Sequence, residues 1–184
     1  MKNAQKQRRL IERIVLLSLF VAISIVAGKY LAIRVGDLFR FSLENTSVLL
    51  AGILFGPVAG MAVGIVADLL GCVLVGYTIN LYVTAGAAAI GLLSGLIFKY
   101  TKGSQALRLT LAVLVAHLVG SVLIKTVGLS QFYGMPLPVL MAWRALNYLI
   151  VGVLDGIVLH LLLNISTIAK YTKPEKKEKS DDDR

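Results

Sequence analysis

Long apolar segments, separated by short polar ones, constrain the fold of this chain more than any other feature. A helix needs about 20 mostly apolar residues to cross the hydrocarbon core of a bilayer. Such segments recur from residue 14 to residue 168. The composition agrees, because only 16% of the residues are charged, against about 25% in a typical soluble domain. The sequence therefore predicts an integral membrane protein.

The segments predict an all-α, polytopic bundle of six transmembrane helices. Gly56–Pro57 indicates a tight turn between two of them, because proline is well tolerated at the first position of a helix. The second segment is short for a full span, whereas the sixth is long enough to tilt or to extend beyond the bilayer. The predicted helices cover about 14–33, 46–55, 57–75, 81–100, 107–129 and 137–168.

Lysine and arginine gather in three parts of the chain, and their placement predicts the orientation. Cytoplasmic loops of membrane proteins are enriched in these residues. Six helices put both termini and the loop near residues 99–108 on that side, which explains the net charge of +9 without nucleic acid. We therefore expect a basic cytoplasmic N-terminus over 1–13, a transmembrane domain over 14–168 and a charged, disordered cytoplasmic tail over 169–184.

Glycines recur every four residues in several of the predicted helices. Close helix packing in lipid depends on small residues, because there is no hydrophobic drive between helices in that environment. We interpret the repeats as internal packing positions of the bundle. They are Gly52, Gly56, Gly60 and Gly64, then Gly91 and Gly95, then Gly152 and Gly156.

Basic residues also lie in the predicted outer half of the bundle, where the usual bias places few. Ionisable side chains inside a membrane are costly and usually face an interior or a cavity. We interpret them as contacts for an anion, with aromatic and amide side chains completing a pocket for a flat heterocycle that bears carboxylates. The candidate substrate-binding residues are Lys29, Arg34, Arg40, Tyr77, Asn80, Lys125, Gln131, Tyr133, Trp143, Arg144 and Asn147.

Several of these residues also have a structural interpretation. Tyr77, Tyr133 and Trp143 suit an aromatic belt at the membrane interface equally well. Lys29 and Lys125 are long enough to reach the lipid headgroups. Both interpretations stay open at this point.

The other ionisable residues in the apolar segments differ in their expected roles. For Arg144, contact with the ligand is favoured over pairing with a buried carboxylate. Asp68 follows the glycine repeat of its helix, where a hydrogen bond within the bundle is its more frequent role. His117 and His160 have no second ligand at metal spacing, so both indicate packing positions rather than a metal site.

No catalytic constellation is found in the sequence. The motifs of zinc proteases, serine hydrolases and phosphate-binding loops are missing, and Cys72 is the only cysteine. We therefore expect no catalytic residues, no metal and no cofactor. If the chain takes part in ATP-driven pumping, the energy must come from a partner.

Two stretches resemble a known family. Ile33-Arg-Val-Gly and then Leu49-Leu-Ala-Gly-Ile-Leu-Phe-Gly-Pro-Val-Ala-Gly-Met-Ala-Val-Gly-Ile-Val-Ala-Asp68 resemble the substrate-binding S components of energy-coupling factor (ECF) vitamin transporters. Gly128-Leu-Ser-Gln-Phe-Tyr-Gly-Met-Pro136, followed by Trp143-Arg144, is similar to the folate branch of that family. The resemblance extends roughly from Leu16 to Leu163.

The resemblance implies a function and a set of partners. S components are six-helix proteins that bind a vitamin at the outer face of a bacterial plasma membrane. They dock on a module of a transmembrane coupling protein and two ATPases, through small residues of the first helix that correspond here to Ser18 and Ala22. ATP hydrolysis is thought to topple the S component, with the loops 34–44 and 71–80 acting as gates.

Within this family, folate is the expected ligand. Its glutamate carboxylates suit the basic residues, and its pterin and benzoyl rings suit the aromatic ones. Three alternatives are left open by the sequence: another vitamin or cofactor precursor, a membrane enzyme that uses Asp68 or His117, and a scaffold that binds no ligand.

Overall fold

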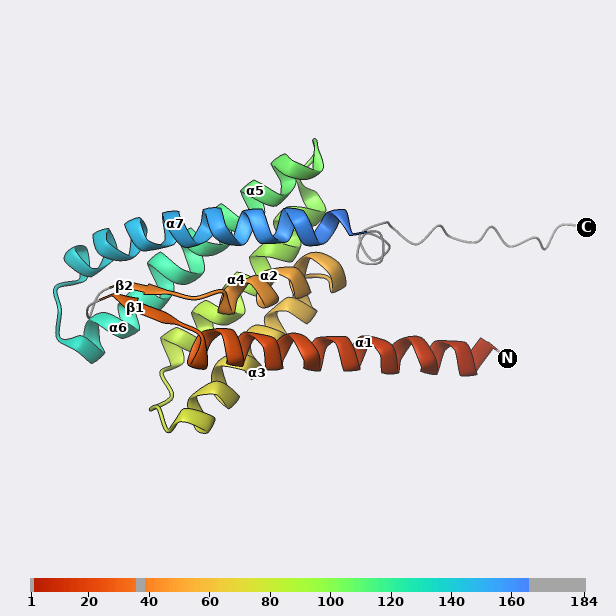
Figure 1. Cartoon of the computed structure of the whole chain (residues 1–184), viewed down its shortest axis with the longest axis horizontal. Helices are drawn as coiled ribbons and strands as arrows, with labels where there is room; N and C mark the ends of the chain where they lie inside the picture. Colours follow the sequence, from red (N-terminus) through yellow and green to blue (C-terminus); the bar gives the residue numbers. More distant parts are fainter. Residues whose placement is uncertain (1, 36–38, 166–184) are drawn as a thin grey trace, which may run out of the picture.

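The computed structural model describes residues 2–35 and 39–165, and this part of the chain is a bundle of helices with a small hairpin at one end (Figure 1). Two of its segments, η1 and η2, are π-helical and directly continue the helices before them. The elements are α1 (Lys2–Ile25), η1 (Val26–Tyr30), β1 (Ile33–Val35), β2 (Phe39–Phe41), α2 (Glu44–Phe55), α3 (Pro57–Val75), α4 (Leu81–Tyr100), α5 (Gln105–Ala116), η2 (His117–Ile124), α6 (Lys125–Tyr133) and α7 (Leu137–Asn164).

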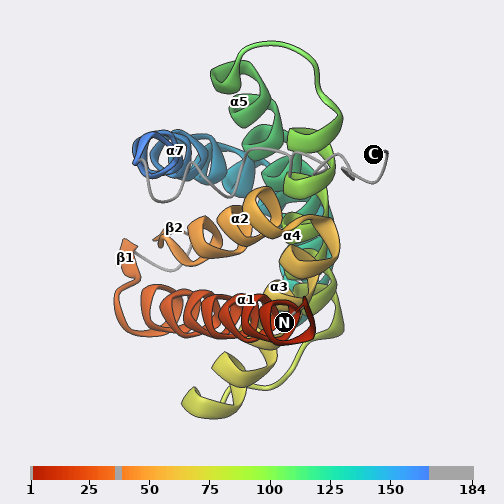
Figure 2. The same cartoon turned by 90° about the vertical axis from the view of Figure 1, so that its right-hand side faces the viewer.

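Five helices in the described part are long and apolar enough to cross a membrane, which confirms an all-α membrane bundle. They are Ala4–Tyr30, Pro57–Val75, Leu81–Tyr100, Gln105–Tyr133 and Leu137–Asn164. The short helix α2 has 12 residues, and residues 45–53 of it are all buried. Figure 2 shows α2 between α1, α4 and α7. The count of six crossings stays a prediction.

The start of α1 and the end of α7 lie at the same end of the bundle (Figure 1). This is the arrangement that an even number of crossings requires, although the side of the membrane that they face stays a prediction. Residues 2–13 belong to α1, because Lys, Gln and Arg are good helix formers and extend it beyond its apolar part. The predicted tail over 169–184 lies outside the described residues.

The predicted helix limits differ in accuracy along the chain. The third and fourth helices were predicted as 57–75 and 81–100, and α3 and α4 have these limits. The fifth helix was predicted as 107–129 and is longer in the structure, where α5, η2 and α6 together run from Gln105 to Tyr133. The last helix was predicted to reach residue 168, but α7 ends at Asn164.

A β-hairpin replaces part of the loop that was predicted after the first helix. β1 and β2 pair antiparallel, with Ile33 opposite Phe41 and Arg34 opposite Arg40. β-Branched and aromatic residues at alternating positions favour strands, and this short alternation went unrecognised in the sequence. The hairpin lies at the end of the bundle opposite the start of α1 (Figure 1).

Glycines bring α2, α3 and α4 into backbone contact. A Cβ atom on Gly60 of α3 would lie 2.5 Å from the carbonyl oxygen of Gly91 on α4, and a Cβ atom on Gly91 would meet the backbone of Gly60. Gly52 and Gly64 are equally close to α4. The prediction of internal packing is thus confirmed for these positions, whereas Gly156 has no neighbour within 4 Å of such a Cβ atom.

Gly56 has a different role from the other members of its repeat. Its φ of +93° is a backbone conformation that other residues rarely adopt, and nothing lies within 4 Å of a Cβ atom placed there. Pro57 follows at the first turn of α3. The predicted tight turn between the second and third helices is confirmed.

Candidate functional site

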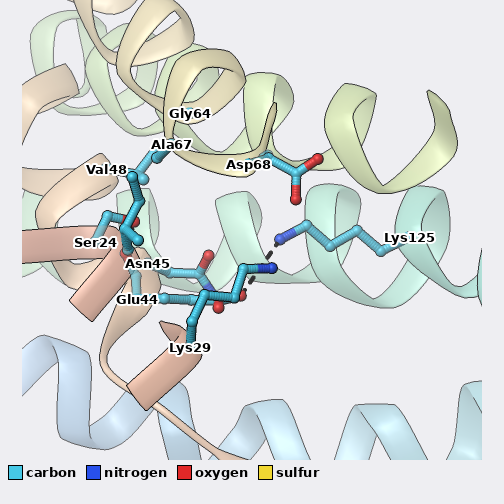
Figure 3. A pocket seen from close by; sticks show the side chains of 11 residues that line it. Ser24, Lys29, Glu44, Asn45, Val48, Gly64, Ala67, Asp68 and Lys125 are labelled. Carbon is cyan, nitrogen blue, oxygen red and sulfur yellow. Dashed lines mark hydrogen bonds and ion pairs between the residues drawn. The ribbon is translucent and has the colours of Figure 1, made fainter. Parts of the chain in front are cut away.

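A cavity lies at the hairpin end of the bundle, between α1, η1, α2, α3, α4 and α6. The two segments that flank the hairpin in the chain both contribute to it, through Lys29 of η1 and Glu44 at the start of α2. The lining residues are Ser24, Ile25, Lys29, Glu44, Asn45, Val48, Gly64, Ala67, Asp68, Ala87 and Lys125 (Figure 3).

Four charged side chains face this cavity, two of each sign. The ammonium of Lys125 lies 3.9 Å from Oε1 of Glu44, and Lys125 is only 5% exposed. Asp68 accepts a hydrogen bond of 2.7 Å from the hydroxyl of Thr84. Because a buried charge is costly without a partner, Glu44 stabilises the ammonium of Lys125 inside the bundle.

Lys29 occupies the side of the cavity next to the end of α3. Its ammonium lies 3.9 Å from Sγ of Cys72 and 5.5 Å from the ring centroid of Tyr77. The ring face of a tyrosine attracts a cation at this distance. Figure 3 shows the Lys29 and Lys125 side chains approaching the same space from opposite sides. The structure therefore brings together two of the predicted basic residues, with Tyr77 beside one of them.

Three of the charged side chains pass over glycines of neighbouring helices. A Cβ atom on Gly28 would collide with Glu44, one on Gly71 would lie 2.8 Å from Cε of Lys29, and one on Gly86 would collide with Lys125. In each case the missing side chain leaves the room that the charged one occupies. Glycine at these positions is thus a condition for the present shape of the cavity.

The space between these side chains is small. It amounts to about 20 Å³ for the centre of a water-sized sphere, which is enough for about one water molecule. Sites for organic ligands usually span about 300–1,000 Å³. A ligand of vitamin size therefore needs some of the lining side chains to move aside.

Arg144 lies outside the cavity, although it was predicted as a ligand contact. Its Nε and Nη2 atoms donate hydrogen bonds of 3.2 and 2.8 Å to the carbonyl oxygen of Ser121. Thr126 donates to the same oxygen. Ser121 belongs to η2, and π-helical segments often occur at functional sites. Arg144 thus holds the segment that directly precedes Lys125.

A buried polar network joins α2, α7 and the start of η2. Asp155 is fully buried, accepts a hydrogen bond from Thr46, and lies 2.8 Å from Nε2 of His117. The other ring nitrogen of His117 lies 3.2 Å from the hydroxyl of Ser121. The prediction that His117 is a satisfied packing residue is confirmed. Its partner was missed, because 38 positions separate the two residues in the chain.

The remaining predicted binding residues are dispersed. Asn80 caps α4 by accepting from the backbone amides of Tyr82 and Val83, and donates to the carbonyl oxygen of Gly128. Asn147 is buried in α7 without lining the cavity. Gln131, Tyr133 and Trp143 are exposed and lie outside the cavity lining. The side chains of Arg34 and Arg40 lie outside the described part of the structure.

The two predicted docking residues lie on the surface of α1. Ser18 and Ala22 are both exposed, and their spacing of four residues puts them on one face of the helix.

The described residues offer no candidate metal site. Among them, no group of three or more His, Cys, Asp or Glu side chains could hold a metal ion.

Glu44 and Asp68 are the charged cavity residues that were not predicted as ligand contacts. Glu44 was placed in the predicted gate loop 34–44, whereas the structure places it at the first position of α2. Its place directly before a buried apolar helix was the available signal, because a carboxylate is favoured at a helix N-terminus.

A bundle of membrane-length helices around a charged internal cavity defines a multi-pass membrane protein with a candidate ligand site. The sequence matches the family described as ECF transporter, substrate-specific component, over residues 12–171. The chain therefore belongs to the substrate-specific (S) components of ECF transporters, and it is a transport subunit.

Comparison with solved structures agrees with this assignment. A crystal structure of FolT bound with folic acid is 25% identical in sequence, with a TM-score of 0.68, over 81% of this chain and 90% of that chain. The S component of a bacterial ECF transporter has the same fold at 22% identity, with a TM-score of 0.66, over 90% of this chain and 99% of that chain. A search of curated proteins found no match.

Proposed function

We propose that this chain is the folate-binding S component of an ECF transporter in a bacterial plasma membrane. The observation that carries the proposal is the convergence of Lys29 and Lys125 on one cavity at the hairpin end of the bundle. Two ammonium groups at one site suit a ligand with two carboxylates, because charge-assisted hydrogen bonds are about twice as strong as neutral ones.

The carboxylates of the cavity add a second requirement. Of these, Asp68 lines the cavity as a hydrogen-bond acceptor and favours a ligand that also carries N–H donors. Folate has both features, since its pterin edge offers amino and ring N–H groups and its glutamate offers two carboxylates. A simple dicarboxylate lacks the donors, and a neutral or cationic vitamin leaves the lysines without a ligand anion.

The solved structure of FolT with folic acid supports the same ligand, because it shares the fold over most of both chains. In the proposed orientation, with both termini cytoplasmic, the cavity lies near the outer face of the membrane. Its position is then suited to capturing a vitamin from outside.

Transport in this proposal depends on partners. Ser18 and Ala22 dock on an ECF module of one transmembrane coupling protein and two ATPase subunits, since exposed small residues on α1 allow close helix approach. ATP hydrolysis by the module drives the toppling that delivers folate to the inside. The chain itself contributes no cofactor and no catalytic step.

The proposal is tested by calorimetry on the purified chain in detergent. Folate is titrated in parallel with biotin, riboflavin and thiamine. We expect tight binding of one folate per chain and no binding of the two vitamins without a carboxylate, riboflavin and thiamine. Tight binding of another vitamin in place of folate would keep the family and contradict the proposed ligand.

A further inference from the structure

The ion pair between Glu44 and Lys125 spans the cavity. Glu44 begins α2 and lies against Gly28 of η1, whereas Lys125 begins α6 and lies against Gly86 of α4. Their charged atoms are 3.9 Å apart (Figure 3). The pair thus connects the two sides of the space that a ligand must enter.

The geometry of this contact leaves it open to competition. A charge-assisted hydrogen bond between an ammonium and a carboxylate is usually about 2.7–2.9 Å long, so the observed 3.9 Å is an attraction without a direct hydrogen bond. A ligand carboxylate that approaches Lys125 to hydrogen-bond distance makes the stronger contact. Since the cavity has room for about one water molecule, that ligand also needs the volume of a lining side chain.

The two partners differ in their access to the outside. The side chain of Glu44 is 19% exposed and that of Lys125 is 6% exposed. Glu44 also lies in the first turn of its helix, three residues after the hairpin strand β2 ends. Glu44 is therefore the partner that can turn outward, while Lys125 stays in place inside the bundle.

We infer that Glu44 is a specificity-determining residue: its carboxylate occupies the place of the ligand carboxylate and is displaced when an anionic ligand binds. A ligand without a carboxylate cannot replace it at Lys125 and meets a closed cavity. Glu44 thus lowers the affinity for an anionic ligand, which has to displace it, and excludes ligands that cannot take its place at Lys125. This inference rests on the proposed folate-binding function and adds to it a competitor built into the site.

The test compares Glu44→Gln with the wild-type chain by calorimetry. The amide keeps the shape of the side chain and removes its charge, so we expect folate to bind at least about tenfold more tightly, a factor that one relieved like-charge contact readily supplies. A pterin that lacks the glutamate moiety should show no such gain. Glu12→Gln is the matched control, because Glu12 is exposed on α1, contacts Arg8 and does not line the cavity.

Each outcome has one meaning. Equal or weaker folate binding by a folded Glu44→Gln variant would overturn the inference, with the proposed function intact if the wild type binds folate. No folate binding by the wild type would overturn both. If Glu44→Gln fails to fold, Glu44→Asp takes its place: its carboxylate is one methylene further from Lys125, so folate affinity should still rise, and an unchanged or lower affinity would contradict the inference.

Discussion

Asp155 of α7 and His117 at the start of η2 form a fully enclosed pair, with 2.8 Å between Oδ2 and Nε2. Thr46 of α2 donates to the other carboxylate oxygen. One carboxylate therefore connects α2, which begins with Glu44 and lines the cavity, with η2, which directly precedes Lys125 of α6.

Removing this carboxylate is predicted to destabilise the fold. Asp155→Ala leaves the buried His117 and Thr46 without their hydrogen-bond partner, which costs about 1–3 kcal/mol for each unsatisfied group. Thermal unfolding in detergent should show a clear fall in the melting temperature. His160→Ala is the control, since His160 is exposed on the same helix. An unchanged melting temperature for Asp155→Ala would contradict the stabilising role of the network.

Arg144 is predicted to act through the backbone of η2 rather than on the ligand. Arg144→Lys keeps the charge but loses the paired hydrogen bonds to Ser121, and hydrogen bonds to charged groups contribute about 1.5–3 kcal/mol each. We expect lower thermal stability together with a weaker affinity for folate, because Lys125 follows η2 directly. Lys102→Ala, at an exposed position, should change neither. A loss of folate affinity at full stability would instead indicate direct ligand contact.

Gly71 offers a way to move Lys29 without removing its charge. A Cβ atom at this position would lie 2.8 Å from Cε of Lys29, near the flexible end of that side chain. Gly71→Ala should therefore fold normally and bind folate about tenfold more weakly, which corresponds to about 1.4 kcal/mol of lost contact energy. Gly156→Ala is the matched control, because nothing lies near its added methyl group. Wild-type affinity in Gly71→Ala would argue against a ligand role for Lys29.

The proposed docking face is tested separately from ligand binding. Ser18→Trp or Ala22→Trp adds a bulky ring where close helix approach needs a small residue. We expect folate uptake by cells to be lost while folate binding by the purified variant stays intact. Ala145→Trp, at an exposed position of α7, is the control for bulk on the bundle surface. Normal uptake in the α1 variants would place the docking face elsewhere.

Much of the fold could be predicted from the sequence because helices in lipid need long apolar segments and small packing residues. α3 and α4 have clear limits, with Pro57 at the start of one and Asn80 capping the other. The hairpin was not predicted, since three-residue strands give too short an alternation to recognise. The extension of α1 to Lys2 depends on polar helix formers, which hydropathy does not detect.

Only part of the cavity lining could be predicted from the sequence. Lys29 and Lys125, which line the cavity, were singled out because a lysine within an apolar segment needs a reason to be there. Arg144 met the same criterion, but its partner is a backbone carbonyl, and no sequence pattern indicates which carbonyl a π-helical segment offers. Glu44 was missed for the opposite reason, because a charged residue next to a loop needs no special explanation.

Folate titration of the double variant Lys125→Met/Glu44→Gln, beside the wild-type chain, is the most direct test of the central claim. The double variant removes both members of the ion pair and leaves one charge of each sign in the cavity, so it should fold. We predict that the wild type binds folate tightly and that the well-folded double variant has lost at least about 100-fold in affinity, as expected for truncating a buried charged contact. Folate binding by the double variant at wild-type affinity would contradict the claim that the charged cavity at the hairpin end is the substrate site.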